Sequence, residues 1–466
     1  MPGDRLELED IQGIVARGYG GLPLAAFLLL GIPSGPGGRA WLAQVADEVT
    51  PADHRPDRTA LHVAFTRQGL VNLGLPEGSI ARFSHEFRDG MTSPHRQRIL
   101  GDTGESAPEH WEWGGPGAPG VDAVLLLYAV DQAAMDTLLA QQTAAAEAHG
   151  LAVQTTPHTS PVLDREPFGF RDGISQPFIE GLGKKGPAVN TIRAGEFVLG
   201  YENEYGLLTD RPVVPADSDP TRLLPVVPGD TGARDFGRNG TYLVFRQLEQ
   251  DVAGFWSHLD SLSRTASGEE DPGTREWLAA KMVGRWPGGA SLVESPEHDD
   301  PALAHANDFG YHERDVDGLR CPVGAHVRRA NPRDSLDPDP GTEASYELNK
   351  RHRLLRRGRP YGPPFDAERG HDGEKRGLHF ICLSANIARQ FEFVQQTWLG
   401  NPKFDGLYDS VDPLLGPRGP GGATYSIPRY PVRQRFTGLP SFVTVRGGAY
   451  FFLPGIRALR YLAAAG

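Results

Sequence analysis

The stretch Asp122–Ala148, DAVLLLYAVDQAAMDTLLAQQTAAAEA, decides the fold. Its first part, 122–130, is a continuous apolar run of the length expected for a buried strand. Its second part, 131–148, is rich in Ala, Gln and Leu, and Gly150 follows it, which predicts a helix that ends near that glycine. The stretch therefore predicts a strand–helix unit, with a returning strand directly after the glycine.

Similar strand–helix units are expected at 61–75, 240–263 and 377–398, where a short apolar run precedes residues with helical spacing. Each half of the chain then holds two such units, separated by long insertions. This pattern predicts an α+β fold of two ferredoxin-like domains, each an antiparallel sheet with covering helices. We place the domains at residues 1–220 and 221–466.

Three other segments complete the predicted outline. Residues 22–32 are apolar but too short to span a membrane, and acidic rather than basic residues precede them, so we expect a core strand or helix and not a secretion signal. Residues 264–319 form an acidic insertion that we interpret as a solvated loop. Residues 442–454 are expected to form paired strands about a Gly-Gly turn.

Charge and cysteine content narrow the function. The 466 residues carry a formal net charge of −12, which argues against a broad nucleic-acid surface. The chain has two cysteines, Cys321 and Cys382, too few for a disulfide framework or a cysteine-ligated zinc site. This usage fits a reducing compartment, so we predict a cytoplasmic protein with no membrane and no nucleic-acid partner.

The first candidate for chemistry is RCPVGAHVRRANPRD, residues 320–334. His326 leaves a small apolar segment beside several cations, and its imidazole could bind a metal through one nitrogen while an acceptor holds the other. Arg328 and Arg333 could neutralise an anionic cofactor at the same place. Taken alone, the segment is better explained by a structural histidine beside a solvated basic face.

The second candidate is GFRDG, residues 169–173. Its two glycines allow backbone angles that would aim Asp172 into a cavity, and apolar neighbours such as Phe170 and Ile174 would raise the pKa of that carboxyl group, as a general acid or base requires. The alternative is a tight turn whose aspartate only caps its own backbone. FRDG also occurs at 87–90 among polar residues, so the four residues alone predict little.

The third candidate is LLRRGRPYG, residues 354–362. Two apolar residues precede paired arginines and a bend, which places at least one guanidinium group at the edge of a core. A buried arginine requires an anion or an oxygen-rich ligand. A basic surface loop is the alternative.

Together these three stretches resemble the motifs of the dye-decolourising peroxidases, and DIQG (10–13), GLHFICL (377–383) and RGGAYFFLPG (446–455) are similar to other family signatures. The length resembles the larger bacterial and fungal members. The resemblance implies two ferredoxin-like domains that hold haem b, with His326 as the iron ligand. It implies that Asp172 moves a proton between the peroxide oxygens and that Arg356, the first arginine of its pair, stabilises developing charge. The other residues that it places around the haem are Gly173, Ile174, Arg328, Arg333, Leu378 and Phe380.

The resemblance also implies the partners: hydrogen peroxide and an organic or metal-ion electron donor, such as a dye or a phenol. A homo-oligomer is left open. Candidate acceptors for the second nitrogen of His326 are Glu392, Asp405, Asp409 and Asp412, and candidate aromatic residues for electron transfer to the surface are Tyr346, Tyr361, Trp398 and Tyr425. Two other functions remain: a haem carrier or sensor with little turnover, and a non-haem metal enzyme built on His326.

Overall fold

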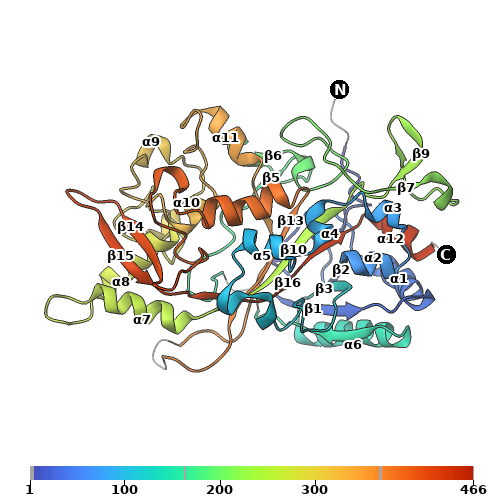
Figure 1. The fold of residues 1–466 in the computed structure, drawn as a ribbon, viewed down its shortest axis with the longest axis horizontal. Helices are drawn as coiled ribbons and strands as arrows, with labels where there is room; N and C mark the ends of the chain where they lie inside the picture. Colours follow the sequence, from blue (N-terminus) through green and yellow to red (C-terminus); the bar gives the residue numbers. More distant parts are fainter. Residues whose placement is uncertain (1–4, 162–163, 367–369, 465–466) are drawn as a thin grey trace.

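A single nine-stranded sheet runs through the molecule (Figure 1). The computed structural model describes residues 5–161, 164–366 and 370–464. The strands follow the order β11-β13-β10-β16-β2-β3-β1-β4, β12 also pairs with β13, and every pairing is antiparallel. Their bounds are β1 (Leu24–Gly31), β2 (Thr59–Phe65), β3 (Ala123–Ala129), β4 (Ala152–Thr155), β10 (Thr241–Gln250), β11 (Leu355–Arg356), β12 (Arg359–Tyr361), β13 (Gly377–Ser384) and β16 (Val443–Leu453).

The sheet consists of two ferredoxin-like units that meet edge to edge. The first has the order β2-β3-β1-β4, with helix α1 (Pro36–Glu48) between β1 and β2 and helix α6 (Gln132–Ala148) between β3 and β4. The second has the same order, β11-β13-β10-β16, with helix α7 (Val252–Ser263) after β10 and two π-type helical segments, Ala388–Glu392 and Val394–Leu399, after β13. Phe452 of β16 pairs with Phe65 of β2 and joins the units. The predicted fold class is confirmed.

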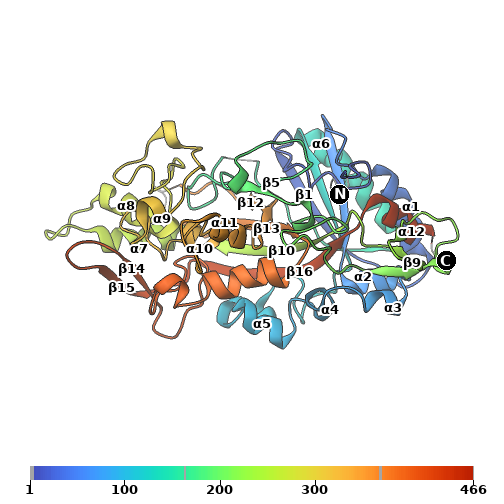
Figure 2. The same cartoon turned by 90° about the horizontal axis from the view of Figure 1, so that it is seen from above.

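The stretch 122–148 folds as its sequence predicts. Every residue of β3 is buried. Asp131 caps helix α6 because its carboxylate accepts a hydrogen bond from the backbone N–H of Ala134. Apolar side chains of α1, α6 and α12 (Ile456–Ala464) cover one face of the sheet, whereas the other face is covered by irregular segments, including residues 6–22. In Figure 2, β10 and β16 run lengthwise between these helices and the elements at the opposite end.

The remaining elements lie outside the large sheet. The helices are α2 (Arg67–Asn72), α3 (Glu77–Ile80), α4 (His85–Asp89), α5 (Pro94–Leu100), α8 (Pro272–Val283), α9 (His312–Asp315), α10 (His326–Ala330), α11 (Glu343–Lys350) and α12 (Ile456–Ala464). The small sheets pair β5 (Phe178–Ile179) with β6 (Thr191–Ile192), β9 (Asp230–Asp235) with β7 (Val213–Pro215) and β8 (Val226–Val227), and β14 (Ala423–Ile427) with β15 (Gln434–Leu439).

Three sequence predictions need correction. In the strand–helix unit expected at 240–263, the strand β10 continues to Gln250, beyond the apolar run, and the helix begins only at Val252. Residues 442–454 do not form a hairpin. They give one long strand, β16, in which Arg446 is an extra residue at a bulge. The insertion 264–319 is more than a solvated loop, since it contains α8, and the C-terminal half of that helix is buried.

Two further predictions concern the organisation of the chain. The boundary at 220/221 falls inside the small sheet in which Val213 pairs with Asp235, and it stays a prediction. In the part of the chain that the structure describes, no helix has the length and apolar character needed to cross a membrane.

Candidate active site

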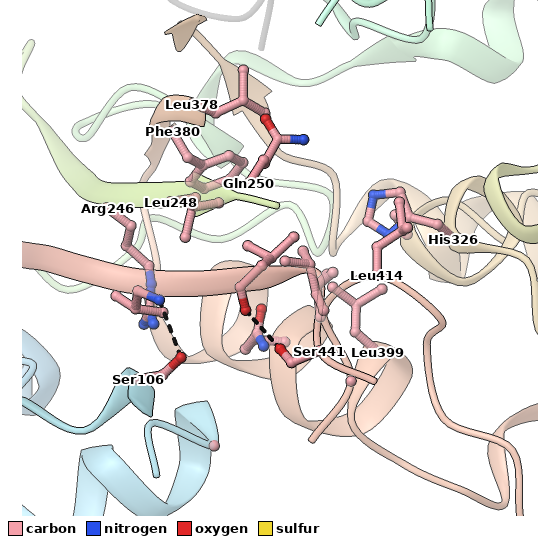
Figure 3. A pocket seen from close by; sticks show the side chains of 18 of the residues that line it. Ser106, Arg246, Leu248, Gln250, His326, Leu378, Phe380, Leu399, Leu414 and Ser441 are labelled. Carbon is pink, nitrogen blue, oxygen red and sulfur yellow. Dashed lines mark hydrogen bonds between the residues drawn. The ribbon is translucent and has the colours of Figure 1, made fainter. Parts of the chain in front are cut away.

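A cavity of about 750 Å³ lies against the sheet of the second unit. This volume is within the range of cofactor and small-molecule sites. Figure 3 shows Leu248 of β10 with Leu378 and Phe380 of β13 on one side of the cavity, and His326 on another side. Residues 169–173, 320–334 and 354–362 each contribute to the lining, so the structure brings the three candidate stretches together.

His326 begins helix α10 and is held by a buried carboxylate. Its Nδ1 lies 2.9 Å from Oδ2 of Asp412, and Oδ1 of Asp412 accepts hydrogen bonds from the backbone N–H groups of Leu414 and Leu415. The structure thus selects Asp412 from the four candidate acceptors. Glu392 instead contacts Arg96, and Asp409 contacts Arg435. Because Asp412 occupies Nδ1, Nε2 is the nitrogen available to a metal.

The two partners shift each other's protonation. Burial alone would lower the pKa of His326, but the charge and hydrogen bond of Asp412 outweigh burial and raise that pKa. Burial alone would raise the pKa of Asp412, but the charge of His326 and the hydrogen bonds that Asp412 accepts lower it. Asp412 is therefore a stable anion that orients the imidazole and increases its basicity.

Asp172 lies in a loop whose flanking glycines have left-handed backbone angles, φ 99° at Gly169 and φ 80° at Gly173. Its Oδ1 accepts hydrogen bonds from the backbone N–H of Gly173 at 2.6 Å and from Nη1 of Arg356 at 2.8 Å. Asp172 and Arg356 both line the cavity. This contact joins two residues that are 184 positions apart in the chain.

The pKa of Asp172 shifts in the direction opposite to the prediction. Burial does raise the pKa of this carboxyl group, as expected from its apolar neighbours. The positive charge of Arg356 and the hydrogen bonds from Gly173 and Arg356 outweigh burial, so the net pKa is lower than usual. Asp172 is ionised at neutral pH and is ready to accept a proton.

The arginines of 354–362 have separate tasks. Arg356 lies in β11, beside Cys382 of β13, and lines the cavity. Arg357 points away from the cavity and donates to the carbonyl oxygens of Ile14 and Val15. Arg359 donates to four more carbonyl oxygens of the same N-terminal segment, those of Gly18, Tyr19, Leu22 and Pro23. The segment 14–23 therefore anchors two arginines that follow Arg356, the residue that contacts Asp172.

Arg328 and Arg333 do not line the cavity. Arg328 is 1% exposed and donates to the carbonyl oxygens of Asp315 and Cys321. Arg333 donates to the carbonyl oxygens of Asn307 and Phe309. These contacts argue against the prediction that either arginine binds an anionic cofactor. Among the other predicted residues, Ile174, Leu378 and Phe380 line the cavity, whereas Gly173 contributes its N–H to Asp172.

Comparison with known proteins identifies the family. No protein-family model matches the chain. It is 30% identical over 464 residues to the dye-decolorizing peroxidase of Mycena epipterygia, across 91% of this chain and 80% of that protein. It is 31% identical over 380 residues to a multifunctional dye peroxidase of an Amycolatopsis species, across 76% of this chain and 74% of that protein. The chain belongs to the dye-decolourising peroxidases.

Solved structures of dye-decolourising peroxidases also resemble this chain. An ancestral D-type dye-decolorizing peroxidase superposes with a TM-score of 0.80 at 27% identity, across 99% of this chain and all of the other. A dye-decolorizing peroxidase in complex with 2,6-dimethoxyphenol gives a TM-score of 0.79 at 26% identity, across 98% of this chain and all of the other. This dye-decolourising peroxidase is therefore an oxidoreductase that uses peroxide.

The peroxidase family implies a haem cofactor, and the cavity fits one. Among residues 5–161, 164–366 and 370–464, no three or more His, Cys, Asp and Glu side chains form a group that could hold a metal ion. Among the described residues, His326 is the histidine that lines this largely apolar cavity, and peroxidases hold haem iron through one proximal histidine. The non-haem metal centre that the sequence left open has no ligand set in these ranges.

Sequence reasoning missed several residues that line the cavity of this peroxidase. Glu166 and Gln250 hydrogen-bond to each other, and Arg246 forms a buried ion pair with Asp102. Arg353 also lines the cavity, and burial lowers its pKa to about 9. Glu166 precedes GFRDG closely, but a carboxylate that binds backbone N–H groups leaves no sequence motif. The others face the cavity only because distant elements meet there.

The aromatic residues suggested for electron transfer divide into two groups. Trp398 is 4% exposed and Tyr425 is fully buried. The hydroxyl of Tyr425 donates to the carbonyl oxygen of Lys281. Tyr346 and Tyr361 are half-buried. The contacts of Trp398 and Tyr425 are those of core residues, and the relay role stays a prediction for all four.

Proposed function

We propose that this peroxidase binds haem b in the cavity through His326, reduces hydrogen peroxide there and oxidises dyes, phenols or similar one-electron donors. The observation that carries the proposal is the contact between Asp172 and Arg356 in the same cavity as the His326–Asp412 pair. One end of the site offers a metal ligand. The other offers a base and a fixed cation.

Haem supplies the electrons that break the O–O bond, and the side chains supply the proton transfer and the charge. Asp172 accepts a proton from one peroxide oxygen and returns it to the other, so that water can leave. Oδ2 of Asp172 is the better proton acceptor, because Oδ1 already accepts two hydrogen bonds. Arg356 keeps Asp172 ionised beforehand and stabilises negative charge as the bond breaks.

Asp412 and the apolar lining complete the proposed mechanism. Asp412 keeps Nδ1 of His326 occupied, which fixes the orientation of the ring and leaves Nε2 for iron. Leu378 and Phe380 line the same cavity, where, with haem bound, they would limit access to small molecules such as peroxide. We propose organic donors because a relative in this family has been solved with 2,6-dimethoxyphenol.

A haem carrier or sensor is the alternative function. It would need His326 and the apolar lining, but it would have no use for a base held against a cation in the cavity. The contact between Asp172 and Arg356 therefore favours the peroxidase. We also keep the proposal of a cytoplasmic location, which rests on the use of two cysteines, both of them free and buried.

The visible absorption spectrum tests the proposal. The purified protein is measured before and after one equivalent of hydrogen peroxide, for wild type, His326→Ala and the exposed-histidine control His298→Ala. We expect a Soret band that shifts on peroxide in wild type and the control, and is lost or much weaker in His326→Ala. A Soret band that does not respond to peroxide would favour the carrier. No band despite ample haem would refute the cofactor.

A further inference from the structure

Glu166 is a cavity residue that the proposed mechanism does not use. Its carboxylate accepts three hydrogen bonds. Oε1 accepts from the backbone N–H of Phe170 at 3.0 Å, and Oε2 accepts from the backbone N–H of Phe168 at 3.0 Å and from Nε2 of Gln250 at 2.9 Å. The side chain thus binds its own loop on one side and the end of β10 on the other.

The backbone of the same loop closes around Glu166. The N–H of Glu166 donates to the carbonyl of Phe170, and the N–H of Gly169 donates to the carbonyl of Glu166, both at 2.8 Å. Trp256 of α7 donates from Nε1 to the carbonyl of Phe168. Residues 166–170 are therefore fixed at both ends and tied to two elements of the second unit.

This loop leads directly to the catalytic carboxylate. Asp172 follows Phe170 by two residues, and its own N–H makes only a long contact of 3.3 Å with the carbonyl of Asp164. Arg171, the residue before Asp172, is held outside the sheet by a bond from its N–H to the carbonyl of Pro287 and by an ion pair with Asp164. The Glu166–Gln250 bond is the one that ties the loop before Asp172 to the end of β10.

We propose that Glu166 is a positioning residue, which holds residues 168–170 to Gln250 and so keeps Asp172 at Arg356. It acts on the peroxide reaction only through Asp172. The inference rests on the proposed role of Asp172 as the base for peroxide.

The protonation of Glu166 sets the conditions for a test. Burial raises the pKa of this carboxyl group to about 7, although its three hydrogen bonds oppose the rise and the charge of Asp172 adds to it. At about pH 8 the carboxylate is mostly ionised, so all three N–H groups have an acceptor. The rates of the variants should therefore be compared at about pH 8.

A double-mutant cycle tests the proposal on the haem-loaded enzyme. The variants are Glu166→Gln, Asp172→Asn and the pair, and the readouts are the rate of reaction with peroxide and, separately, the donor-dependent step. The amide of Glu166→Gln places an N–H₂ group against an N–H donor, which frees the loop. We expect the peroxide step to slow by about 10- to 100-fold, because small misplacements of a catalytic group have effects of that size.

Two results would show that the effect passes through Asp172. In the Asp172→Asn background, Glu166→Gln should change the peroxide step by less than about twofold, since contacts that act as a unit are not additive. The donor-dependent step should be unchanged in the single variant. Glu202→Gln is the matched control, because it makes the same Glu-to-Gln change at an exposed ion pair with Arg193, outside the cavity, and it should behave as wild type.

An additive cycle, or a Glu166→Gln enzyme as fast as wild type, would overturn the proposal. If Glu166→Gln does not retain haem, Gln250→Leu replaces it, because this change removes the Glu166–Gln250 hydrogen bond from the side of Gln250. The double-mutant cycle of Gln250→Leu with Asp172→Asn then tests whether the effect on the peroxide step passes through Asp172. A wild-type enzyme that does not react with peroxide would instead refute the proposed function, so the two failures are distinguishable.

Discussion

The chain contains FRDG twice, and only one copy belongs to the active site. The two aspartate side chains are almost equally exposed, 47% for Asp89 and 48% for Asp172. Both are followed by a glycine with a left-handed φ angle, 77° at Gly90 and 80° at Gly173. The exposed surface of Asp172, however, faces the cavity. The motif and the left-handed φ of the glycine that follows it are thus shared, and the surroundings decide which copy lines the cavity.

The residues before each motif explain the difference. Ser84 accepts a hydrogen bond from the N–H of Phe87, which starts helix α4, and Asp89 becomes the last residue of that helix. Glu166 instead binds the N–H groups of an irregular loop. The partners also differ. Asp89 lies 3.4 Å from Arg96, an arginine that already contacts Glu392, whereas Asp172 lies 2.8 Å from Arg356. An identical tetrapeptide therefore gives a helix end or a catalytic loop.

The largest effect should follow from Asp172→Asn. The amide cannot accept the proton of peroxide, so we expect the peroxide step to slow by about 10²- to 10⁴-fold, the usual contribution of a general base. Stopped-flow mixing with peroxide measures the rate, and the Soret band should be that of wild type. A rate within a few-fold of wild type would mean that the two FRDG copies do not differ in function.

Arg356→Leu should have the next largest effect, about 10²- to 10³-fold on the same step, because it removes a charge that stabilises the transition state. It should also change the pH dependence. Arg356 lowers the pKa of Asp172, and without it burial raises that pKa. Since the base works only when ionised, the variant should lose activity at a higher pH than wild type as the solution is acidified. Equal acid limits in a pH–rate profile would contradict this.

Gly173→Ala and Gly90→Ala form a matched pair with a smaller effect. Both glycines have a left-handed φ, and a Cβ at either one would meet no atom within 4 Å. Each substitution should therefore cost about 1–3 kcal/mol of folding free energy from backbone strain alone. Only Gly173→Ala should also slow the peroxide step, by about 10-fold or more, because it moves Asp172. Urea unfolding and stopped-flow kinetics separate the two quantities, and equal kinetic losses would contradict the comparison.

Asp89→Asn should have the smallest effect. Its ion pair with Arg96 is half exposed, and Arg96 retains Glu392 at 2.7 Å. Exposed ion pairs of this kind contribute at most about 1 kcal/mol, and usually less. We expect a melting temperature close to that of wild type and an unchanged peroxide step. A loss of activity here would show that the first FRDG copy also serves the site.

The sequence predicts what is periodic or carried by short motifs. The strand–helix units, the ferredoxin-like fold and the meeting of His326, Asp172 and Arg356 in one cavity follow from such signals. It does not predict where β10 ends, because the strand continues through the largely polar residues 246–250. It does not predict that β16 is continuous, because Gly447-Gly448 resembles a turn. Arg328 misleads for a physical reason. A buried arginine can be satisfied by carbonyl oxygens as well as by a cofactor, and only the fold shows which.

The pKa shift of Asp172 is another property whose direction the sequence alone does not predict. Its apolar neighbours are visible in the sequence, and they do raise the pKa. The charge that reverses the shift comes from Arg356, 184 residues later in the chain. Electrostatic partners that are distant in sequence cannot be paired without the fold, unless a family resemblance supplies them.

The anchoring of Arg357 and Arg359 by residues 14–23 has a consequence for the order of folding. These hydrogen bonds join groups up to 343 positions apart, so during synthesis the N-terminal segment emerges long before the arginines that it binds. Contacts of such separation form late, since most of the chain must be ordered first. The strand that carries Arg356 can therefore settle only near the end of folding. A chain stalled before residue 357 would lack both arginines, so the carbonyl groups of residues 14–23 would have no donors from them.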